Sequence, residues 1–363
     1  RGFWLTARAR VLVVTHGFGD VNRYATRGGF VVQLWHGIPL KRLHLDSPAA
    51  LRVSFLPDHR LVRALMARAY RFAGRGISLF PVSSELVVPR IASAFGIPRD
   101  RIVVTGDPRD DALIRSLAER GDGRRRVAPG GRRRILYAPT WRDGKPDPSV
   151  PDAAGWAFIA AWLEEHDAEL CVRTHPLGHG DYADGPAASP RITLQGSEQI
   201  VDITPELGGF DALITDYSSI AFDYALVGGP IVFLAPDIES YAKTRGLYEP
   251  YRTFSGGSHV ASWESALAVL GRRLRERKPG RHELWLRNEY FDHLDGRATE
   301  RVLDEVLRRI DRARGSGPAP DSGVVRPRVT AVEVAEDAGA PVLRVTAEGR
   351  VRGLVLDGPR AHP

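Results

Sequence analysis

The stretch ALITDYSSIAFDYALVGGPIVFL, residues 212–234, decides the fold. Its first residues predict a buried strand that ends at Thr215, and a helix follows from about Ser219 to the glycine pair at 228–229. Pro230 then leads into a second β-branched run. A tight strand–helix–strand unit of this kind is the building block of a parallel sheet covered by helices.

The same alternation extends over most of the chain. Strands are predicted at residues 10–16, 30–35, 77–82, 101–105, 135–138, 169–174, 212–215 and 231–234. Helices are predicted at residues 58–72, 84–95, 156–165, 219–227 and 299–314. This pattern indicates an α/β protein with two Rossmann-like αβα domains, in which ligands bind beyond the carboxyl ends of the strands.

The length of 363 residues suits two domains, and the Gly- and Arg-rich segment 121–134 interrupts the alternation. We therefore predict one Rossmann-like domain at residues 1–125 and a second at residues 126–314. A Gly/Pro/Ser linker at 315–326 and a short β-rich tail at 327–363 follow, and the tail looks like part of a larger accessory domain. The chain starts at Arg1, which predicts that an upstream part is missing.

The chain is basic, with a net charge of +7 and a pI near 9.7. Such a balance favours an anionic partner: a phosphate-rich substrate, nucleic acid or an anionic membrane surface. The basic run 124–134 has no aromatic residues for base stacking, so nucleic acid is not expected. The single Cys171 excludes an intramolecular disulfide and a cysteine metal cluster, and it fits a reducing compartment.

Ser218 and Ser219 stand where the strand of the deciding stretch gives way to its helix. Both are good N-cap residues, and the first amides of a helix, together with its dipole, form an anion site that suits a diphosphate. The alternative is that they only cap a structural helix. Asp216 would repel phosphate, so it would accept from a hydroxyl or stiffen the turn. Asp223 is expected to be a solvated or capping charge.

Two histidines, His36 and His175, follow predicted strands. Phosphoryl transfer to an alcohol needs a base for the hydroxyl proton and positive groups for the phosphate, and histidine can serve either need near neutral pH. Gly37 would let a substrate approach the backbone closely. A hydrogen-bonded core or turn histidine is the alternative, and His16 is a weaker candidate in the same setting.

Cationic side chains lie close to these strand ends. Arg142 and Arg173 could hold phosphate with two parallel hydrogen bonds, although surface ion pairs are the alternative. Lys41 and Arg42 would add positive charge to one wall of a cleft. Asp202 could orient an acceptor hydroxyl or cap a helix.

Six segments together resemble one known family. They are LWHGIPLKR at 34–42, SSELVVPRIASAFGIPRDRIVVTGDPRDD at 83–111, ILYAPTWRD at 135–143, VRTHP at 172–176, DITPELGGFDALITDYSSIAFDYALVGGPIVFL at 202–234 and LDGRATERVLDEVL at 294–307. In this order and spacing they resemble the CDP-glycerol glycerophosphotransferases, the polyol-phosphate transferases of teichoic-acid synthesis. The resemblance covers about residues 10–314.

The resemblance implies a GT-B fold whose first domain serves the acceptor and whose second binds the CDP-activated donor. It implies a CDP-polyol donor and a polyol-phosphate polymer or lipid-linked primer as acceptor, with no cofactor and no metal. His36 would be the catalytic base, and His175 a second essential histidine on the donor phosphate. The expected substrate-binding residues are Gly37, Lys41, Thr140, Arg142, Arg173, Asp202, Asp216, Ser218 and Ser219.

Two other functions remain open at this point. A GT-B glycosyltransferase that uses a nucleotide sugar would share the fold, and a non-catalytic nucleotide- or polymer-binding module would share much of the sequence pattern. We expect a cytoplasmic protein at the inner face of the plasma membrane. The basic amphipathic helix at 58–72 is the candidate contact with anionic lipid, unless its apolar side faces a core.

Overall fold

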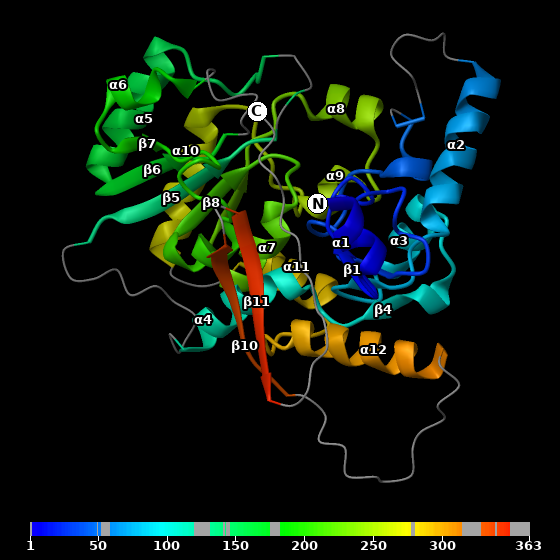
Figure 1. Cartoon of the computed structure of the whole chain (residues 1–363). Coiled ribbons are helices and arrows are strands. Elements are labelled where there is room, and N and C mark those ends of the chain that lie inside the picture. The colour runs from blue at the N-terminus through cyan, green and yellow to red at the C-terminus, as the bar shows by residue number, and fades with distance from the viewer. Residues whose placement is uncertain are drawn as a thin grey trace.

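The computed structural model describes residues 2–48, 50–51, 59–119, 131–140, 142, 146–174, 182–276, 280–313, 328–337 and 340–348. His175 and the linker at 315–326 lie outside these residues. We call residues 2–119 the first half and residues 131–290 the second half; they lie side by side in Figure 1.

A five-stranded parallel sheet forms the centre of the second half, in the order β7-β6-β5-β8-β9. Its strands are β5 (Arg133–Ala138), β6 (Ala168–Val172), β7 (Ile192–Leu194), β8 (Ala212–Thr215) and β9 (Ile231–Phe233). The deciding stretch forms β8, α7 (Ile220–Val227) and β9 as expected. The carboxyl ends of β5 and β8 meet, because Ala138 pairs with Thr215.

The first half contains β1 (Val11–Val14), β2 (Phe30–Gln33), β3 (Phe80–Val82) and β4 (Ile102–Val104). β1 pairs with β2 and β3 with β4, all in parallel. A parallel bridge between Val32 and Leu79 links the two pairs. The alternation of short apolar runs with helices therefore produces a parallel arrangement in both halves, and the predicted α/β class is confirmed.

Helices cover the strands of both halves (Figure 1). The remaining α-helices are α1 (Gly2–Arg8), α2 (Arg60–Gly74), α3 (Val88–Phe95), α4 (Asp111–Glu119), α5 (Ala153–Glu165), α6 (Gly185–Ala188), α8 (Ile238–Arg245), α9 (Tyr251–Phe254), α10 (Trp263–Glu276), α11 (Arg281–Tyr290) and α12 (Ala298–Ala313). Short 3-10 helices are η1 (His44–Asp46), η2 (Arg99–Arg101), η3 (Pro108–Asp110) and η5 (Thr204–Gly209). β10 (Arg328–Asp337) and β11 (Ala340–Glu348) form an antiparallel hairpin.

One hydrophobic core runs through both halves. Leu40 and Phe80 of the first half belong to the same cluster as Phe222 and Tyr290 of the second. The backbones also meet, because the Tyr248 amide donates to the Leu40 carbonyl at 3.0 Å. The halves are therefore packed directly against each other, and side chains at the two sets of strand ends can come into contact.

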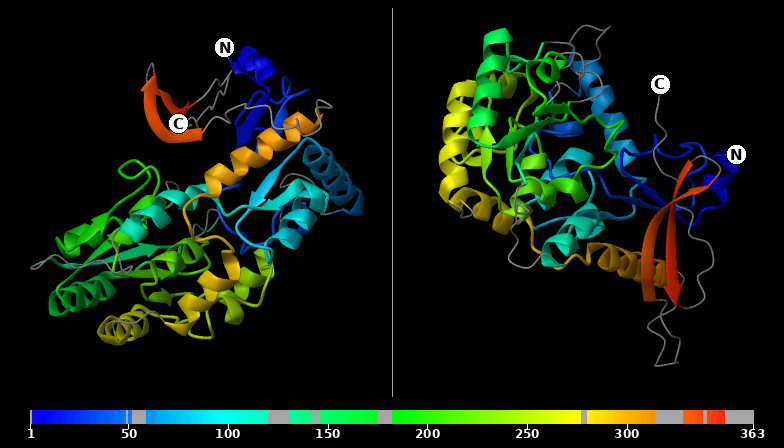
Figure 2. Two further views of the ribbon diagram at one scale, coloured as in Figure 1. Left: turned by 90° about the horizontal axis from the view of Figure 1, so that it is seen from below. Right: turned by 90° about the vertical axis from the view of Figure 1, so that its left-hand side faces the viewer.

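Helix α12 crosses back from the second half to the first (Figure 2). Its Val302 and Val306 pack on Val32 and Leu79 in the first half. The guanidinium of Arg309 donates to the backbone of residues 78 and 100. The sequence pattern had grouped this helix with the second domain; the boundary near residue 125 itself falls outside the described residues and stays a prediction.

None of the described helices combines the length and the apolar character that crossing a membrane requires.

Candidate active site

The turn between β8 and α7 carries the predicted phosphate-binding serines. Ser219 occupies the N-cap position of α7, but its own backbone is helical (φ −64°, ψ −14°) and its side chain makes no capping hydrogen bond. Ser218 and Ser219 are both half-buried. A purely capping role therefore lacks its hydrogen bond, and the Ser219 hydroxyl stays available to an anion at the start of α7, although the amides of Ala221 and Phe222 already donate to the carbonyls of Ser218 and Ser219.

Asp216 in the same turn has a defined environment. Its buried carboxylate accepts from the Thr140 amide at 3.0 and 3.1 Å, and from the Thr140 hydroxyl at 2.7 Å. Arg142 lies 2.6 Å from the same carboxylate. Asp216 thus ties the end of β5 to the end of β8, and its oxygens are directed at protein donors.

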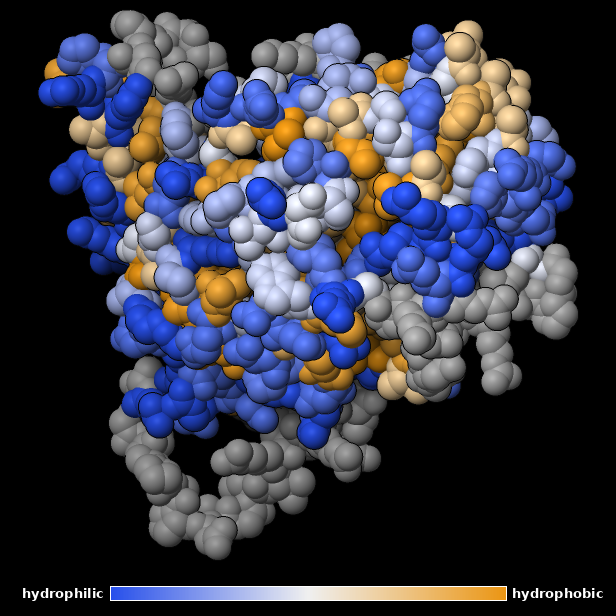
Figure 3. All heavy atoms as spheres, turned by 180° about the vertical axis from the view of Figure 1, so that it is seen from behind, coloured by the Kyte–Doolittle hydropathy of each residue, from blue (hydrophilic) through white to orange (hydrophobic). Residues whose placement is uncertain are grey.

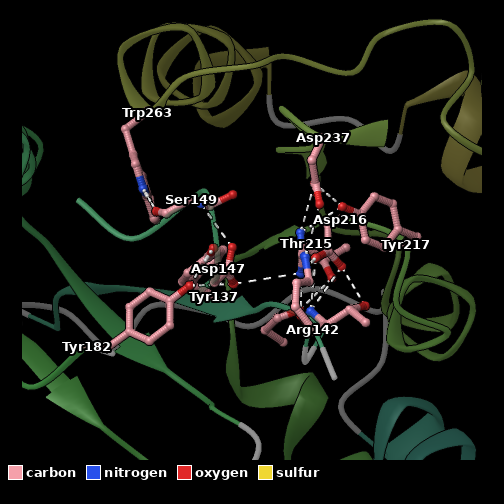
Figure 4. A network of polar contacts seen from close by, with 12 residues as sticks. Tyr137, Arg142, Asp147, Ser149, Tyr182, Thr215, Asp216, Tyr217, Asp237 and Trp263 are labelled. Carbon is pink, nitrogen blue, oxygen red and sulfur yellow. Dashed lines mark hydrogen bonds and ion pairs between the residues drawn. The ribbon is translucent and has the colours of Figure 1, made fainter. Parts of the chain in front are cut away.

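Arg142 uses every donor of its guanidinium within the protein (Figure 4). Nε and one terminal nitrogen bind Asp237 at 3.3 and 3.1 Å, and that nitrogen also donates to the Tyr217 hydroxyl at 2.7 Å. The other terminal nitrogen donates to Asp216 and to the Thr140 carbonyl. A guanidinium has five N–H groups, so the predicted grip of Arg142 on a phosphate would require it to release existing partners.

Three carboxyl groups surround this arginine, and that of Asp216 is buried. We define the Arg142 cluster as Arg142, Thr140, Asp147, Asp216, Tyr217 and Asp237. Burial alone would lower the pKa of Arg142, but the charge of Asp216 and the contacts with Asp237 raise it. Burial would likewise raise the pKa of Asp237, but hydrogen bonds from Arg142 and Tyr217 hold it below its usual value. The cluster is a closed network in which one guanidinium faces three carboxyl groups.

A chain of hydrogen bonds anchors this cluster in the second half (Figure 4). Asp147 lies 3.7 Å from Arg142 and accepts from the Tyr182 hydroxyl at 2.7 Å. The Ser149 amide donates to Asp147 at 2.9 Å, and the Trp263 indole donates to the Ser149 carbonyl at 2.8 Å. These contacts connect the turn after β8, through Arg142 and Asp147, to Tyr182 and Trp263.

Lys41 brings a cation from the first half to this network. Its ammonium lies 3.5 Å from the Thr140 hydroxyl and 5.5 Å from the centre of the Tyr241 ring. Tyr241 in turn stacks on Tyr217 at 3.8 Å. Burial lowers the pKa of Lys41 to about 8, so the side chain is still mostly charged at neutral pH.

His36 lies at the end of β2 between two aromatic rings. Trp35 stacks on one side at 4.1 Å and His16 on the other at 4.7 Å. Nδ1 of His36 lies 3.4 Å from the Thr15 carbonyl, a contact that favours the proton on Nδ1 and leaves Nε2 as an acceptor. The side chain keeps access to solvent, yet desolvation and then the charge of His16 lower the pKa of His36 to about 4. Neutral imidazole is the form that can accept a proton.

Gly37 brings the His36 loop against the N-terminus of α7. Its φ of +132° is a conformation that other residues rarely adopt. A Cβ at this position would lie 3.4 Å from Oγ of Ser219 and 2.7 Å from a terminal nitrogen of Arg109. The structure therefore brings together His36–Gly37 from the first half and Ser219 from the second.

Arg109 is the residue that sequence reasoning missed. One of its terminal nitrogens donates to the His36 carbonyl at 2.7 Å, and the other donates to Thr204 and Asp223, each at 2.7 Å. Asp223 is buried within α7, so the expectation that it is solvated or a cap is wrong. The available signal was the apolar character of α7 on all sides, which leaves no solvated face for a charge.

Further carboxyl groups lie around Arg109. We define the Arg109 cluster as Arg109, Asp107, Asp110, Thr204 and Asp223. Burial raises the pKa of Asp107 to about 7, and burial also raises the pKa of Asp110 and of Asp223. Neither oxygen of the buried Asp110 has a hydrogen-bond partner among the described residues, which favours its protonated form.

The other predicted residues lie around this site. Arg173 donates to the carbonyl of Ile200 at 2.9 Å, so it holds the loop before η5. Asp202 is exposed and accepts from the Thr204 amide at 2.9 Å. The described residues hold no cluster of three or more His, Cys, Asp or Glu side chains suited to a metal ion.

Comparison with known proteins connects this geometry to a family. Residues 1–308 match the family model described as CDP-glycerol:poly(glycerophosphate) glycerophosphotransferase. The chain is 29% identical over 241 residues to the teichoic acid ribitol-phosphate polymerase TarK of Staphylococcus aureus, covering 63% of this chain and 45% of TarK. It is 24% identical over 298 residues to a teichoic acid glycerol-phosphate transferase of the same species, covering 76% of this chain and 71% of the relative.

Solved structures of the wall teichoic acid polymerase TagF have the same fold. A histidine-to-asparagine variant of TagF aligns with a TM-score of 0.66 and 22% identity, over 85% of this chain and 74% of TagF. The same variant has been solved after soaking with CDPG, with a TM-score of 0.65 and 22% identity over 84% of this chain and 73% of TagF. The expected GT-B fold is therefore confirmed. The chain spans less than half the length of TarK. It belongs to the CDP-glycerol:poly(glycerophosphate) glycerophosphotransferase family.

Proposed function

We propose that this protein transfers a polyol phosphate, most simply glycerol phosphate, from a CDP-activated donor to a hydroxyl group and releases CMP. The acceptor is a lipid-linked primer or a growing polymer of the teichoic-acid or capsule type. Membership of the family supports the donor class, and relatives named for glycerol phosphate and for ribitol phosphate both match. The choice between the two polyols is thus a question for experiment.

One observation carries the proposal: the His36–Gly37 segment lies directly against Ser219 at the start of α7. A base in one half and an anion site in the other are the two parts that phosphoryl transfer to an alcohol requires. The neutral imidazole of His36 has Nε2 available for the proton of the acceptor hydroxyl. The hydroxyls and first amides of the Ser218–Ser219 turn bind the phosphates of the donor.

At phosphorus the reaction forms one P–O bond and breaks another. The acceptor oxygen attacks the phosphorus that carries the polyol while His36 takes the hydroxyl proton. The bond between that phosphorus and the oxygen bridging to CMP breaks, so CMP leaves with the bridging oxygen. No oxidation or reduction occurs, and the residues named need only position the groups and stabilise negative charge.

The other predicted residues contribute in different ways. Lys41 supplies positive charge beside the turn, close to the Thr140 hydroxyl. Thr140, Arg142 and Asp216 act indirectly, because their mutual contacts fix the shape of the turn. Direct contacts of His175, Arg173 and Asp202 with the donor or acceptor remain predictions.

A substrate panel tests the proposal. The protein is incubated with CDP-glycerol, CDP-ribitol or UDP-sugars, each with and without a lipid-linked glycerol-phosphate primer, and nucleotide release is measured. We expect CMP release that depends on the primer and on one CDP-polyol. UDP release without CMP would establish a glycosyltransferase, and no turnover with any donor despite nucleotide binding would establish a binding module.

The His36→Asn variant tests the catalytic base. Loss of the base should lower kcat by about 100- to 10,000-fold while the affinity for CMP stays the same. His59→Asn is a matched control, because His59 is exposed and caps α2 away from the site. Because the pKa of His36 lies at about 4, protonation of His36 should not lower kcat/KM of the wild type between pH 7 and about pH 5. Full activity of His36→Asn would remove this residue from the mechanism.

We also propose a peripheral contact with an anionic membrane through α2. Leu61, Leu65 and Phe72 are 74%, 67% and 74% exposed on this helix. Basic residues of α2 lie among them, and Figure 3 shows blue and orange side chains mixed along the left-hand edge, where α2 lies. Exposed apolar residues flanked by arginines are typical of helices that lie in the lipid headgroup layer.

Vesicle flotation tests this contact. The wild type should float with vesicles that contain phosphatidylglycerol and stay behind with pure phosphatidylcholine vesicles. The triple variant Leu61→Ser, Leu65→Ser and Phe72→Ser should lose binding, whereas Phe158→Ser, an exposed position on α5, should keep it. Equal binding by the triple variant would exclude α2 as the contact.

A further inference from the structure

The guanidinium of Arg109 makes three short hydrogen bonds and has further N–H groups without an acceptor among the described residues. Its three anchors, at 2.7 Å each, are the His36 carbonyl, the Thr204 hydroxyl and the Asp223 carboxylate. They account for three of the five N–H groups of a guanidinium. Within the described part of the chain, no acceptor takes the Nε proton or the second proton of the nitrogen that binds His36. The side chain is 25% exposed, whereas that of Arg142 is 5% exposed.

The unused donors lie at the meeting point of the two halves. The nitrogen that binds His36 lies 2.7 Å from the position that a Cβ on Gly37 would occupy, and Oγ of Ser219 lies 3.4 Å from that same position. Arg109 and Ser219 therefore flank the His36–Gly37 peptide from opposite halves of the chain. A phosphoryl group bound at the start of α7 lies within reach of both.

The charges nearby leave Arg109 able to attract an anion. Asp223 forms the direct ion pair with it, and raised pKa values favour neutral forms of Asp110 and, below about pH 7, of Asp107. Asp202 also raises the pKa of Arg109, but it is exposed and its charge is screened by solvent. The firm anchors fix the guanidinium in advance, so little conformational entropy is lost when it binds a phosphate.

From this geometry we infer that Arg109 is a substrate-contacting residue that binds the transferred phosphoryl group, together with Ser219. The inference rests on the proposed function and names the cation of that site. Arg109 stabilises the negative charge that builds up on the phosphoryl oxygens as the bond to CMP breaks. Its bond to the His36 carbonyl also fixes the base relative to the same phosphorus.

A comparison of CDP with CMP tests the contact without turnover. CDP carries the second phosphate, which corresponds to the transferred group, and CMP lacks it. The wild type should bind CDP more tightly than CMP in calorimetry. Arg109→Lys should lose about 10-fold of CDP affinity and keep CMP affinity within about twofold, since an ammonium cannot replace the planar fork. Retained CMP affinity also reports a folded site.

Turnover gives the second measurement. Arg109→Lys should lower kcat by about 100-fold with CDP-glycerol and primer. Arg109→Ala should lose more, and guanidinium chloride at millimolar concentration should restore part of the rate, whereas methylammonium should not. Arg99→Lys is the matched control, because Arg99 lies in η2 at the other end of β4 and pairs with exposed Glu85.

Two results would overturn the inference. Equal losses of CDP and CMP affinity in Arg109→Lys would show that the residue only supports the fold, and unchanged affinity together with unchanged kcat would show that it does nothing at the site. A wild type that prefers CDP through Arg109 but turns over no CDP-polyol would instead refute the proposed function, while the phosphate contact would stand.

Discussion

Two arginines, one from each half of the chain, lie near the site, and they differ in how many of their N–H groups are already bound to protein groups. Arg142 has all five donors bound to protein groups, and three carboxylates surround it. Arg109 has three donors bound and two without a partner among the described residues. The difference teaches that the sequence position of an arginine near a strand end does not reveal its role. A saturated guanidinium stabilises a turn, whereas a partly used one can still bind a ligand.

The largest effect is expected when Arg142 is removed. Arg142→Met leaves the buried Asp216 and the half-buried Asp237 without their cation, so the free energy of unfolding should fall by about 3–5 kcal/mol. Urea unfolding followed by circular dichroism measures this change. Arg142→Lys keeps the charge with fewer donors and should lose less. An unchanged unfolding midpoint in Arg142→Met would show that the saturated guanidinium does not stabilise the turn, and the contrast with Arg109 would fail.

The next effect concerns the peptide between Arg109 and Ser219. Gly37→Ala should cost about 1–3 kcal/mol of stability because of its φ of +132°. Its Cβ would also push against Arg109, so kcat should fall by about 10- to 100-fold. Thermal unfolding and steady-state kinetics measure the two changes.

Gly28→Ala is the matched control for that variant. Gly28 has a φ of +87°, and no atom lies within 4 Å of the position that a Cβ would occupy there. The substitution therefore strains the backbone without adding a contact at the site. It should lose stability and keep kcat. A similar fall of kcat in both variants would mean that the loss at Gly37 comes from strain alone.

The smallest effect is a change in pH dependence. The pKa of Asp107 is raised to about 7 in the folded protein, so between about pH 4 and pH 7 the folded form holds a proton that the unfolded chain has released. The contribution of Asp107 to stability is therefore lost as the pH rises through this range. Asp107→Asn keeps the N-cap of η3 and should make the free energy of unfolding fall less between pH 5 and pH 7.5.

The control for this prediction is Asp152→Asn, which replaces an exposed N-cap carboxylate on α5. Urea titrations at several pH values should give it the wild-type slope. Asp237 of the Arg142 cluster has a lowered pKa, so its contribution has the opposite sign and is lost only in acid. An Asp107→Asn variant whose stability changes between pH 5 and pH 7.5 by the same amount as the wild type would contradict the assignment of Asp107.

The sequence predicted the parallel strands and the turn at Ser218–Ser219, because local periodicity and turn chemistry determine both. It did not predict Arg109, whose partners at residues 36, 204 and 223 lie 73, 95 and 114 residues away. Nor did it predict that Arg142 is saturated, since Asp216 and Asp237 reach it only through the pairing of β5 with β8 and of β8 with β9. Such contacts depend on tertiary packing, which a single sequence does not show.

The return of α12 to the first half has a consequence for synthesis on the ribosome. Roughly 200 residues separate the end of β4 from the start of α12, so about 10–40 seconds of translation pass before the helix that covers Val32 and Leu79 emerges. During that interval the first half exposes part of its apolar surface to chaperones and proteases. Nascent chains arrested before residue 298 should therefore be cleaved more readily within β2 and β3 than chains arrested well beyond residue 313.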